Sequence, residues 1–201
     1  MSRKIVLDIE TTELFVHEGH RIVEIAAIEL EGGKPTGREF HVYLNPDVPI
    51  MPEITQIHGL TNEFLADKPR FPEIARELRD FIGDSPIVIT CRTMDNNYVL
   101  DKAFINAEMK EAGFPPFKDE QWVNVRRWSE AMFGNDDASL NKVLDHYKID
   151  RSERDRNGHS ATLDARLLSE VYPKLLRDYK QFIEKQVPLA SKPMKITPPT
   201  A

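Results

Sequence analysis

The sequence has a single cysteine, Cys91, among its 201 residues. A lone cysteine cannot form an intramolecular disulfide, and it offers no set of thiolates that would suggest a zinc site. Free cysteine of this kind is ordinary in a reducing compartment. We therefore expect a cytoplasmic protein.

Long apolar runs are also missing. No stretch approaches the roughly 20 apolar residues that a membrane-spanning helix needs. Residues 1–4 lead straight into a strand-like run instead of the apolar core of a signal peptide. We expect a chain that neither enters a membrane nor is exported.

An excess of basic residues is absent as well, because the formal net charge is -6. This charge argues against a protein that grips long nucleic acid by neutralising many phosphates. It does not argue against an enzyme that holds only the end of a strand through metal ions. With 40% hydrophobic residues, a chain of this length can bury one good core, which favours one domain with a tail over two full domains.

What the sequence does contain is a block of strand-like segments followed by helical ones. Strand-like apolar patterns cover residues 3–9, 22–31, 37–44 and 87–90. Helical periodicity covers residues 54–57, 62–66, 71–82, the segment after Asp101, and residues 125–133, 139–147 and 160–185. This order indicates an α/β layered domain. We assign residues 1–185 to that domain and residues 186–201, which hold four prolines, to a flexible tail.

Two carboxylates stand at the end of the first strand-like run, in Asp8-Ile9-Glu10-Thr11-Thr12. Successive side chains of an extended strand alternate between faces, so Asp8 and Glu10 project from the same side. Like charges held that close repel each other, and cations between them would give a reason for the arrangement. A divalent-metal site is the first hypothesis, and a solvated strand edge is the alternative.

Further candidate ligands lie far along the chain. Ser160 is a plausible N-cap of the last long helix, which leaves His159 in the loop before that helix and places Asp164 about one turn inside it. Asp101 opens another stretch with a helical apolar face. These acids and one histidine could join the first pair in a single site.

Taken together, four segments of the sequence resemble the DEDDh branch of the DnaQ-like 3′–5′ exonucleases and, within it, the proofreading exonucleases of the epsilon type. They are Asp8-x-Glu10-Thr11-Thr12, Ile57-His58-Gly59-Leu60-Thr61, Asp101-x-x-Phe104-Ile105-Asn106-x-Glu108-Met109, and His159 followed at a five-residue offset by Asp164. They run in the family's order over roughly residues 4 to 172. Any one segment is weak evidence, but their order is specific for the superfamily.

The resemblance implies a fold, a set of ligands and a base. The fold is a ribonuclease H-like three-layer α/β arrangement with a five-stranded mixed sheet flanked by helices. Two divalent cations, Mg²⁺ or Mn²⁺, would be held by Asp8, Glu10, Asp101 and Asp164, and His159 would be the general base. The residues expected to line the pocket of the terminal nucleotide are Thr11, Thr12, Leu14 and His58.

The same resemblance implies the reaction and its partners. Water would attack the last phosphodiester of a single-stranded or frayed DNA 3′ end and release a nucleoside 5′-monophosphate, in proofreading during DNA replication. An RNA-trimming exonuclease similar to ribonuclease T or oligoribonuclease is an alternative, because the same acids would serve both substrates. A non-catalytic module that binds nucleic-acid ends is the other alternative.

The chain departs from the family pattern in two places. The glycine that usually follows the paired threonines is replaced by Glu13, which puts the fit of the substrate in doubt. In place of the usual His-Asn-Ala-x-Phe-Asp, residues 90–101 read TCRTMDNNYVLD. An ungapped reading makes Asp95 the metal ligand, whereas a reading with a short insertion makes it Asp101. We prefer Asp101, because the helical motif that follows then falls where the family has it.

Two further segments of the sequence carry minor features. His17 and His20 form a His-x-x-His pair without a second pair of ligands, and we interpret them as surface histidines. The segment QVPLAS, residues 186–191, loosely resembles the glutamine-led sliding-clamp motif of epsilon-type proteins. Gln186 and Leu189 would then contact the clamp, and a plain linker is the alternative. The tail is short for the segment with which epsilon-type proteins hold the replicative polymerase subunit.

Overall fold

The fold is built on one mixed sheet of five strands, in the order β3-β2-β1-β4-β5. The computed structural model describes residues 3–94 and 97–186. The strands are β1 (Arg3–Thr11), β2 (Ile22–Glu31), β3 (Lys34–Tyr43), β4 (Ile87–Ile89) and β5 (Trp122–Asn124). The first three form an antiparallel meander, and β4 and β5 add to the edge of β1 in parallel. The five-stranded mixed sheet expected from the resemblance is thus confirmed.

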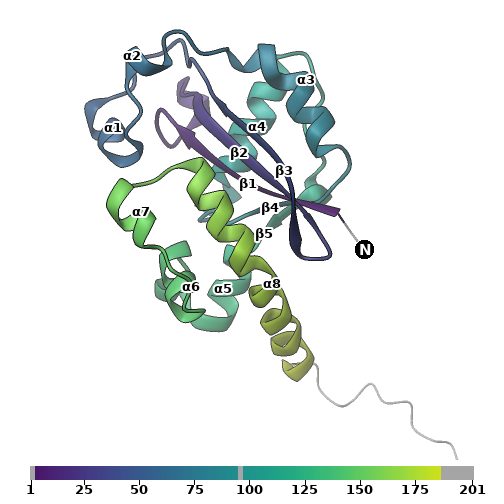
Figure 1. Ribbon diagram of the computed structural model, residues 1–201. Helices are drawn as coiled ribbons and strands as arrows, with labels where there is room; N and C mark the ends of the chain where they lie inside the picture. The colour runs from purple at the N-terminus through teal and green to yellow at the C-terminus, as the bar shows by residue number, and fades with distance from the viewer. Residues whose placement is uncertain (1–2, 95–96, 187–201) are drawn as a thin grey trace, which may run out of the picture.

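Eight α-helices are described around this sheet (Figure 1). They are α1 (Pro52–His58), α2 (Asn62–Leu65), α3 (Phe71–Ile82), α4 (Leu100–Glu111), α5 (Arg126–Phe133), α6 (Leu140–His146), α7 (Ser152–Asn157) and α8 (Ala161–Gln186). Within the described residues, no helix is long and apolar enough to cross a membrane. The expected tail, apart from Gln186, lies outside the described residues.

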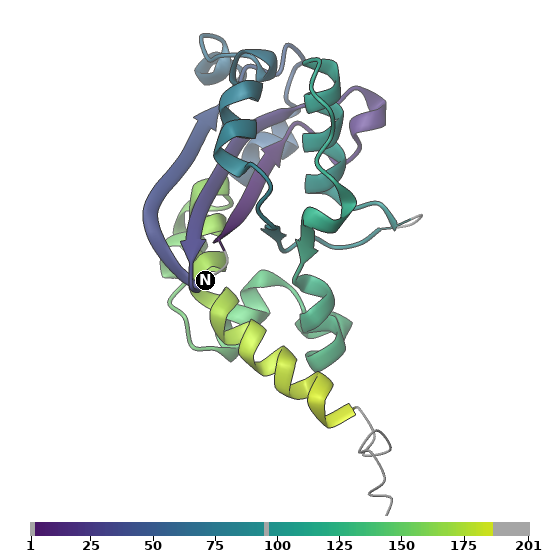
Figure 2. The same ribbon diagram turned by 90° about the vertical axis from the view of Figure 1, so that its right-hand side faces the viewer.

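The sheet separates two apolar cores. Ile5 and Leu7 of β1 face one core, which also holds the apolar sides of α3 and α4. Val6 of the same strand faces the other core, which is formed with α6 and α8. Figures 1 and 2 show α3 and α4 on one side of the sheet and α8 along the other. Because both faces of β1 are covered, the strand is continuously apolar from Ile5 to Leu7, and Asp8 and Glu10 then appear on the α8 side.

Most segments predicted from periodicity are confirmed, with boundaries that shift by a few residues. Two were not predicted. Strand β5 has only three residues, too few to show an alternating pattern. Helix α7 has six residues, four of them charged, and therefore carries no apolar stripe. Both matter for function, because β5 lies beside the carboxyl end of β4 and α7 supplies a residue to the site.

Candidate active site

The end of β1 supplies the first two carboxylates. Asp8 pairs across the antiparallel ladder with Ala26, and Glu10 pairs with Glu24, before the register shifts at Thr11. Asp8 and Glu10 both line a cleft of about 390 Å³. The prediction from strand alternation, that the two acids share one side, agrees with this placement.

Helix α4 brings the third carboxylate to the same cleft. Asp101 is buried in the first turn of α4 and lies beside the thiol of Cys91. Burial and the negative charge of Asp101 raise the pKa of this thiol, so Cys91 stays protonated. Between the two readings of the second motif, the structure brings Asp101 to the acids of β1. Asp95, the alternative, lies outside the described residues.

A buried glutamate on β2 fixes the beginning of α8. Glu24 is 1% exposed. Its carboxylate accepts hydrogen bonds from the backbone N–H groups of Ala161 (3.0 Å) and Thr162 (3.4 Å), and it also contacts His41 at 2.9 Å. Burial alone would raise the pKa of Glu24, but these hydrogen bonds outweigh it and lower the pKa.

Ser160 occupies the N-cap position, since its carbonyl accepts the bond from the N–H of Asp164 at 2.9 Å. Its hydroxyl, however, donates to Glu24 at 3.3 Å and does not cap the helix. The prediction that Ser160 is the N-cap of α8 is therefore confirmed, but the first N–H donors of the helix are not satisfied by the Ser160 hydroxyl. A carboxylate from the sheet does so instead, and this contact sets where His159 and Asp164 lie.

Arg154 of α7 connects the last two predicted site residues. Its Nε and Nη2 donate to the two oxygens of Asp164 at 2.5 and 2.9 Å, and its Nη1 donates to Asn141 at 2.6 Å. Its Nη2 also lies 3.1 Å from Nδ1 of His159. Arg154 and Asp164 are both buried. The guanidinium is thus a positive charge placed within the acidic cluster.

The cleft gathers all five residues predicted to be catalytic, namely Asp8, Glu10, Asp101, His159 and Asp164. Burial raises the pKa of Asp8 well above its usual range, with further contributions from the neighbouring acids. Burial and the charge of Asp164 likewise raise the pKa of Glu10 to about 8. Such crowding is unfavourable for the protein alone, so a site for cations explains it better than a structural role.

The arrangement fits divalent metal ions. One ligand atom from each of Glu10, His159 and Asp164 can be chosen so that all three atoms lie within 4.8 Å of one another. The four carboxylates provide hard oxygen donors, which suit Mg²⁺ and Mn²⁺. The protonated Cys91 thiol offers no competing soft ligand.

His159 stands at the mouth of the cleft with about half of its side chain exposed. Its Nδ1 lies 3.7 Å from a carboxylate oxygen of Asp164. Partial burial and the positive charge of Arg154 lower the pKa of His159, although Asp164 opposes the shift. The imidazole is therefore neutral at neutral pH, which is the form that can accept a proton.

The four residues predicted to bind the terminal nucleotide do not line the acidic cleft. The hydroxyl of Thr11 donates to the carbonyl of Glu13, and the hydroxyl of Thr12 accepts from the N–H of Arg21. Leu14 is exposed. The Glu13 position therefore keeps a tight local turn without the glycine that the family has there.

His58 is buried, and its Nδ1 accepts a hydrogen bond from the N–H of Leu60 at 3.1 Å. The proton of the neutral ring is therefore on Nε2, which makes no hydrogen bond of ordinary length among the described residues, although the backbone of Thr11 interacts with the ring. Burial lowers the pKa of His58, so the ring is neutral. Next to it, the N–H of His159 donates to the carbonyl of Ile57 at 3.1 Å, which joins the end of α1 to the loop before α8.

Sequence reasoning missed Arg154 and Glu24. Arg154 sits in a polar stretch with several arginines, where no periodicity distinguishes the one that turns inward. Glu24 did leave a signal, because a carboxylate within the apolar run Ile22-Val23-Glu24-Ile25-Ala26 is expensive to bury unless it has several donors.

Four carboxylates and a histidine gathered at the end of the central strand β1 are typical of a phosphodiesterase that depends on divalent metal ions. The family model described as "Exonuclease" (RNase_T) matches residues 5–172. The chain belongs to this family and is an exonuclease of the DEDDh branch.

Named relatives agree with this assignment. The DNA polymerase III subunit epsilon of Rickettsia felis is 38% identical over 176 residues, which are 86% of this chain and 73% of that protein. The subunit of the same name from Escherichia coli K12 is 38% identical over 179 residues, covering 86% of this chain and 70% of that protein. These relatives favour neither an RNA-trimming enzyme nor a non-catalytic module.

Solved structures share the fold at low sequence identity. Exonuclease X in complex with 5′ overhanging duplex DNA superposes with a TM-score of 0.66 at 20% identity, covering 89% of this chain and 92% of that chain. Exonuclease I of E. coli in complex with a dT13 oligonucleotide gives a TM-score of 0.72 at 17% identity, covering 92% of this chain and 43% of that chain. At these identities the likeness establishes the fold alone.

Proposed function

We propose that the chain removes single nucleotides from the 3′ end of single-stranded or frayed DNA and acts as a proofreading exonuclease in DNA replication. The observation that carries the proposal is the convergence of Asp8, Glu10, Asp101, Asp164 and His159 on one cleft. The likeness to epsilon subunits supports a DNA end as the substrate. A role in replication would require the enzyme to act in the cytoplasm, as the likeness to epsilon subunits supports.

The four carboxylates would hold two Mg²⁺ or Mn²⁺ ions. When bound, such a pair of cations supplies an activated water and stabilises the charge that develops on the leaving oxygen. The protein's own part is to hold Asp8 and Glu10 on a strand covered on both faces, and Asp101 and Asp164 in the first turns of two helices. The ligands therefore come from rigid elements.

His159 is proposed to take the proton from the attacking water at a ring nitrogen. Its lowered pKa keeps the ring neutral and ready to accept. Asp164, 3.7 Å away, then stabilises the imidazolium that forms. The 3′-oxygen of the penultimate nucleotide leaves, and a nucleoside 5′-monophosphate is released.

The terminal nucleotide is proposed to lie between the end of β1 and the end of α1. The buried Nε2–H of His58, which makes no hydrogen bond of ordinary length among the described residues, is a donor that substrate can satisfy. The exposed side chain of Leu14 is placed to pack on a base. Thr11 and Thr12 contribute through the turn that they hold, since their hydroxyls are already engaged.

Residues 1–185 are proposed as the exonuclease domain and residues 186–201 as a tail that connects it to other replication proteins. The likeness to epsilon subunits supports a replicative polymerase subunit as a partner. Gln186 and Leu189 are proposed to contact a sliding clamp, and unchanged clamp affinity after both are replaced by alanine would rule this out.

Primer–template duplexes test the proofreading assignment. The account expects faster removal of a mismatched 3′-terminal deoxynucleotide than of a matched one, because a mismatched end frays more readily. RNA oligonucleotides of equal length serve as the comparison. Equal rates on matched and mismatched ends, or a preference for RNA, would contradict the proposal in favour of a trimming enzyme.

A further inference from the structure

A second hollow, of about 850 Å³, adjoins the acidic cleft. We call it the aromatic pocket and define it by Phe15, His17, Arg92, Met94, Tyr98 and Lys102, which are among its lining residues. Arg92 is a lining residue of both hollows, so the pocket and the cleft are neighbours at that residue. None of the four residues proposed to bind the terminal nucleotide lines the pocket.

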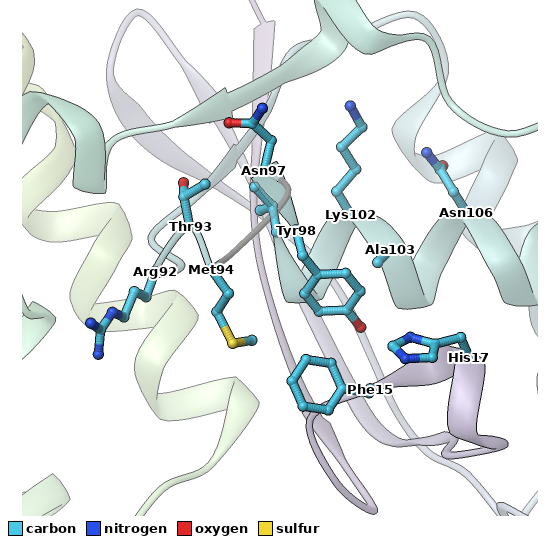
Figure 3. A pocket seen from close by; sticks show the side chains of 11 residues that line it. Phe15, His17, Arg92, Thr93, Met94, Asn97, Tyr98, Lys102, Ala103 and Asn106 are labelled. Atoms are coloured by element: carbon cyan, nitrogen blue, oxygen red, sulfur yellow. The ribbon is translucent and has the colours of Figure 1, made fainter.

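Three rings form one wall of the aromatic pocket (Figure 3). The centroid of Phe15 lies 5.5 Å from that of Tyr98 and 5.4 Å from that of His17. The hydroxyl of Tyr98 donates to the carbonyl of Leu14 at 3.0 Å and accepts from the N–H of Val16 at 3.2 Å. The wall is therefore hydrogen-bonded to Leu14, the residue proposed to pack on the terminal base.

The segment that departs from the family's second motif, residues 90–101, supplies Tyr98 of this wall and the neighbouring lining residues Arg92, Thr93 and Met94. Thr93 and Val99 form an antiparallel bridge, and the N–H of Met94 donates to the carbonyl of Tyr98 at 2.8 Å. Figure 3 shows Met94 beside the ring of Phe15, with Arg92 beyond it. The altered second motif thus changes more than the position of a metal ligand, because it also adds the ring of Tyr98 and the positive charge of Arg92 next to the active site.

The chemistry of the wall suits single-stranded nucleic acid. Base stacking on aromatic rings tolerates any sequence, and nearby cations pair with the backbone. The pocket offers three rings together with the basic side chains of Arg92 and Lys102. The latter also pairs with the exposed Asp119 at 2.9 Å, so it is already held beside the pocket. A volume of this size accommodates a nucleotide.

We propose that the aromatic pocket binds a nucleobase of the substrate strand upstream of the scissile phosphate, with Arg92 and Lys102 against the flanking phosphates. This inference rests on the proposed function, since it assigns a further binding site to the same strand. It makes Phe15, His17 and Tyr98 determinants of affinity for long single strands, and it leaves the hydrolytic step to the cleft.

The test compares a decamer of deoxythymidylate with the p-nitrophenyl ester of thymidine 5′-monophosphate, which has no upstream nucleotide. Replacing Phe15 and His17 together by alanine is expected to raise KM for the decamer about tenfold, within the range of base-stacking effects. The values of kcat/KM for the small ester should not change. Phe64→Ala is the matched control, because it removes an exposed ring that lines neither the pocket nor the cleft, and it should leave the values for both substrates unchanged.

A second arm compares the wild type with the same double variant. The substrates are decamers with one abasic position that is moved stepwise from the 3′ end. At one upstream position the missing base should raise the KM of the wild type about tenfold. At that position the missing base should not raise the KM of the double variant further. Equal KM for wild type and variant, or no sensitive position, would overturn the inference while hydrolysis continues. If the proposed function itself were wrong, the result would differ, because the wild type would then hydrolyse neither substrate. Fluorescence anisotropy of labelled decamers then makes the same comparison through binding alone.

Discussion

The guanidinium of Arg154 occupies both carboxylate oxygens of Asp164, at 2.5 and 2.9 Å, in a buried position within the acidic cleft. The same guanidinium lies 3.1 Å from Nδ1 of His159. A bidentate pair of this kind fixes the rotamer of the aspartate. The pair also occupies lone pairs of Asp164 that a metal ion or a proton would otherwise use. Arg154 therefore both positions Asp164 and opposes the binding of further positive charge.

The first prediction concerns Arg154→Gln. Removing a positive charge from the cluster should tighten Mn²⁺ binding, with a Kd lower by about tenfold, which corresponds to about 1.4 kcal/mol. The metal-free protein should become less stable by about 3 kcal/mol or more, because a buried carboxylate loses its partner. Calorimetric titration with Mn²⁺ and thermal melting in chelator measure the two effects. Weaker Mn²⁺ binding by the variant would show that Arg154 only positions Asp164.

The second prediction decides between the two readings of the second motif. Asp101→Asn should lower kcat more than about 100-fold, because the loss of an outer-shell partner alone costs about 10–100-fold in such sites. Asp95→Asn should keep most of the activity. Rates on a labelled single-stranded oligonucleotide check both, and the reverse ranking would invalidate the preferred alignment.

The third prediction concerns the carboxylate that starts α8. Glu24→Gln should lower the free energy of unfolding by about 1–3 kcal/mol. The amide group of glutamine has one acceptor oxygen fewer than the carboxylate, so N–H donors at the start of α8 would lose their partner. Glu31→Gln, at an exposed position of the same strand, is the control and should change stability by less than about 0.5 kcal/mol. Urea unfolding measures both. Equal stability of the two variants would contradict the stabilising role of Glu24 at the N-terminus of α8.

The fourth prediction follows from the raised pKa of Glu10. A carboxyl group whose pKa is about 8 in the folded protein and about 4.3 in the unfolded chain costs stability as pH rises between these values. In chelator at pH 8, Glu10→Gln should therefore melt above the wild type, by about 2–4 °C for each kcal/mol relieved.

The difference in melting temperature should shrink as the pH is lowered toward about 4, because Glu10 is then protonated in both the folded protein and the unfolded chain. Saturating Mn²⁺ should reverse the order, because the wild type keeps a ligand that the variant has lost. Glu120→Gln, at an exposed position, is the matched control. A variant that melts below the wild type in chelator at pH 8 would show that Glu10 is not under repulsion.

The predicted site residues that the structure brings together in the cleft share a local signature. Asp8 and Glu10 follow from the alternation of a strand, and Asp164 follows from the start of a helix. Asp101 could be placed because the apolar pattern after it marks the beginning of α4. In each case the neighbours along the chain determine where the side chain points.

The features that were missed depend on contacts between distant segments. Arg154 joins the site because six-residue α7 packs near α8, which no local pattern in a polar stretch reveals. Glu24 caps a helix that begins 137 residues later. The aromatic pocket combines Phe15 with Tyr98, and His17, predicted to be a plain surface histidine, belongs to it. Such partners become visible only when the fold brings the segments together.

The central claim is that the cleft hydrolyses nucleic acid from the 3′ end with cations held by its carboxylates. Single-stranded DNA labelled at either end, incubated with Mg²⁺, with Mn²⁺ and with chelator beside an Asp8→Ala control, tests it most directly. We expect immediate release of labelled 5′-mononucleotide from the 3′-labelled strand, stepwise shortening of the 5′-labelled strand, and no reaction in chelator or in the variant. No hydrolysis under any condition, or internal cleavage that persists without Asp8, would contradict it.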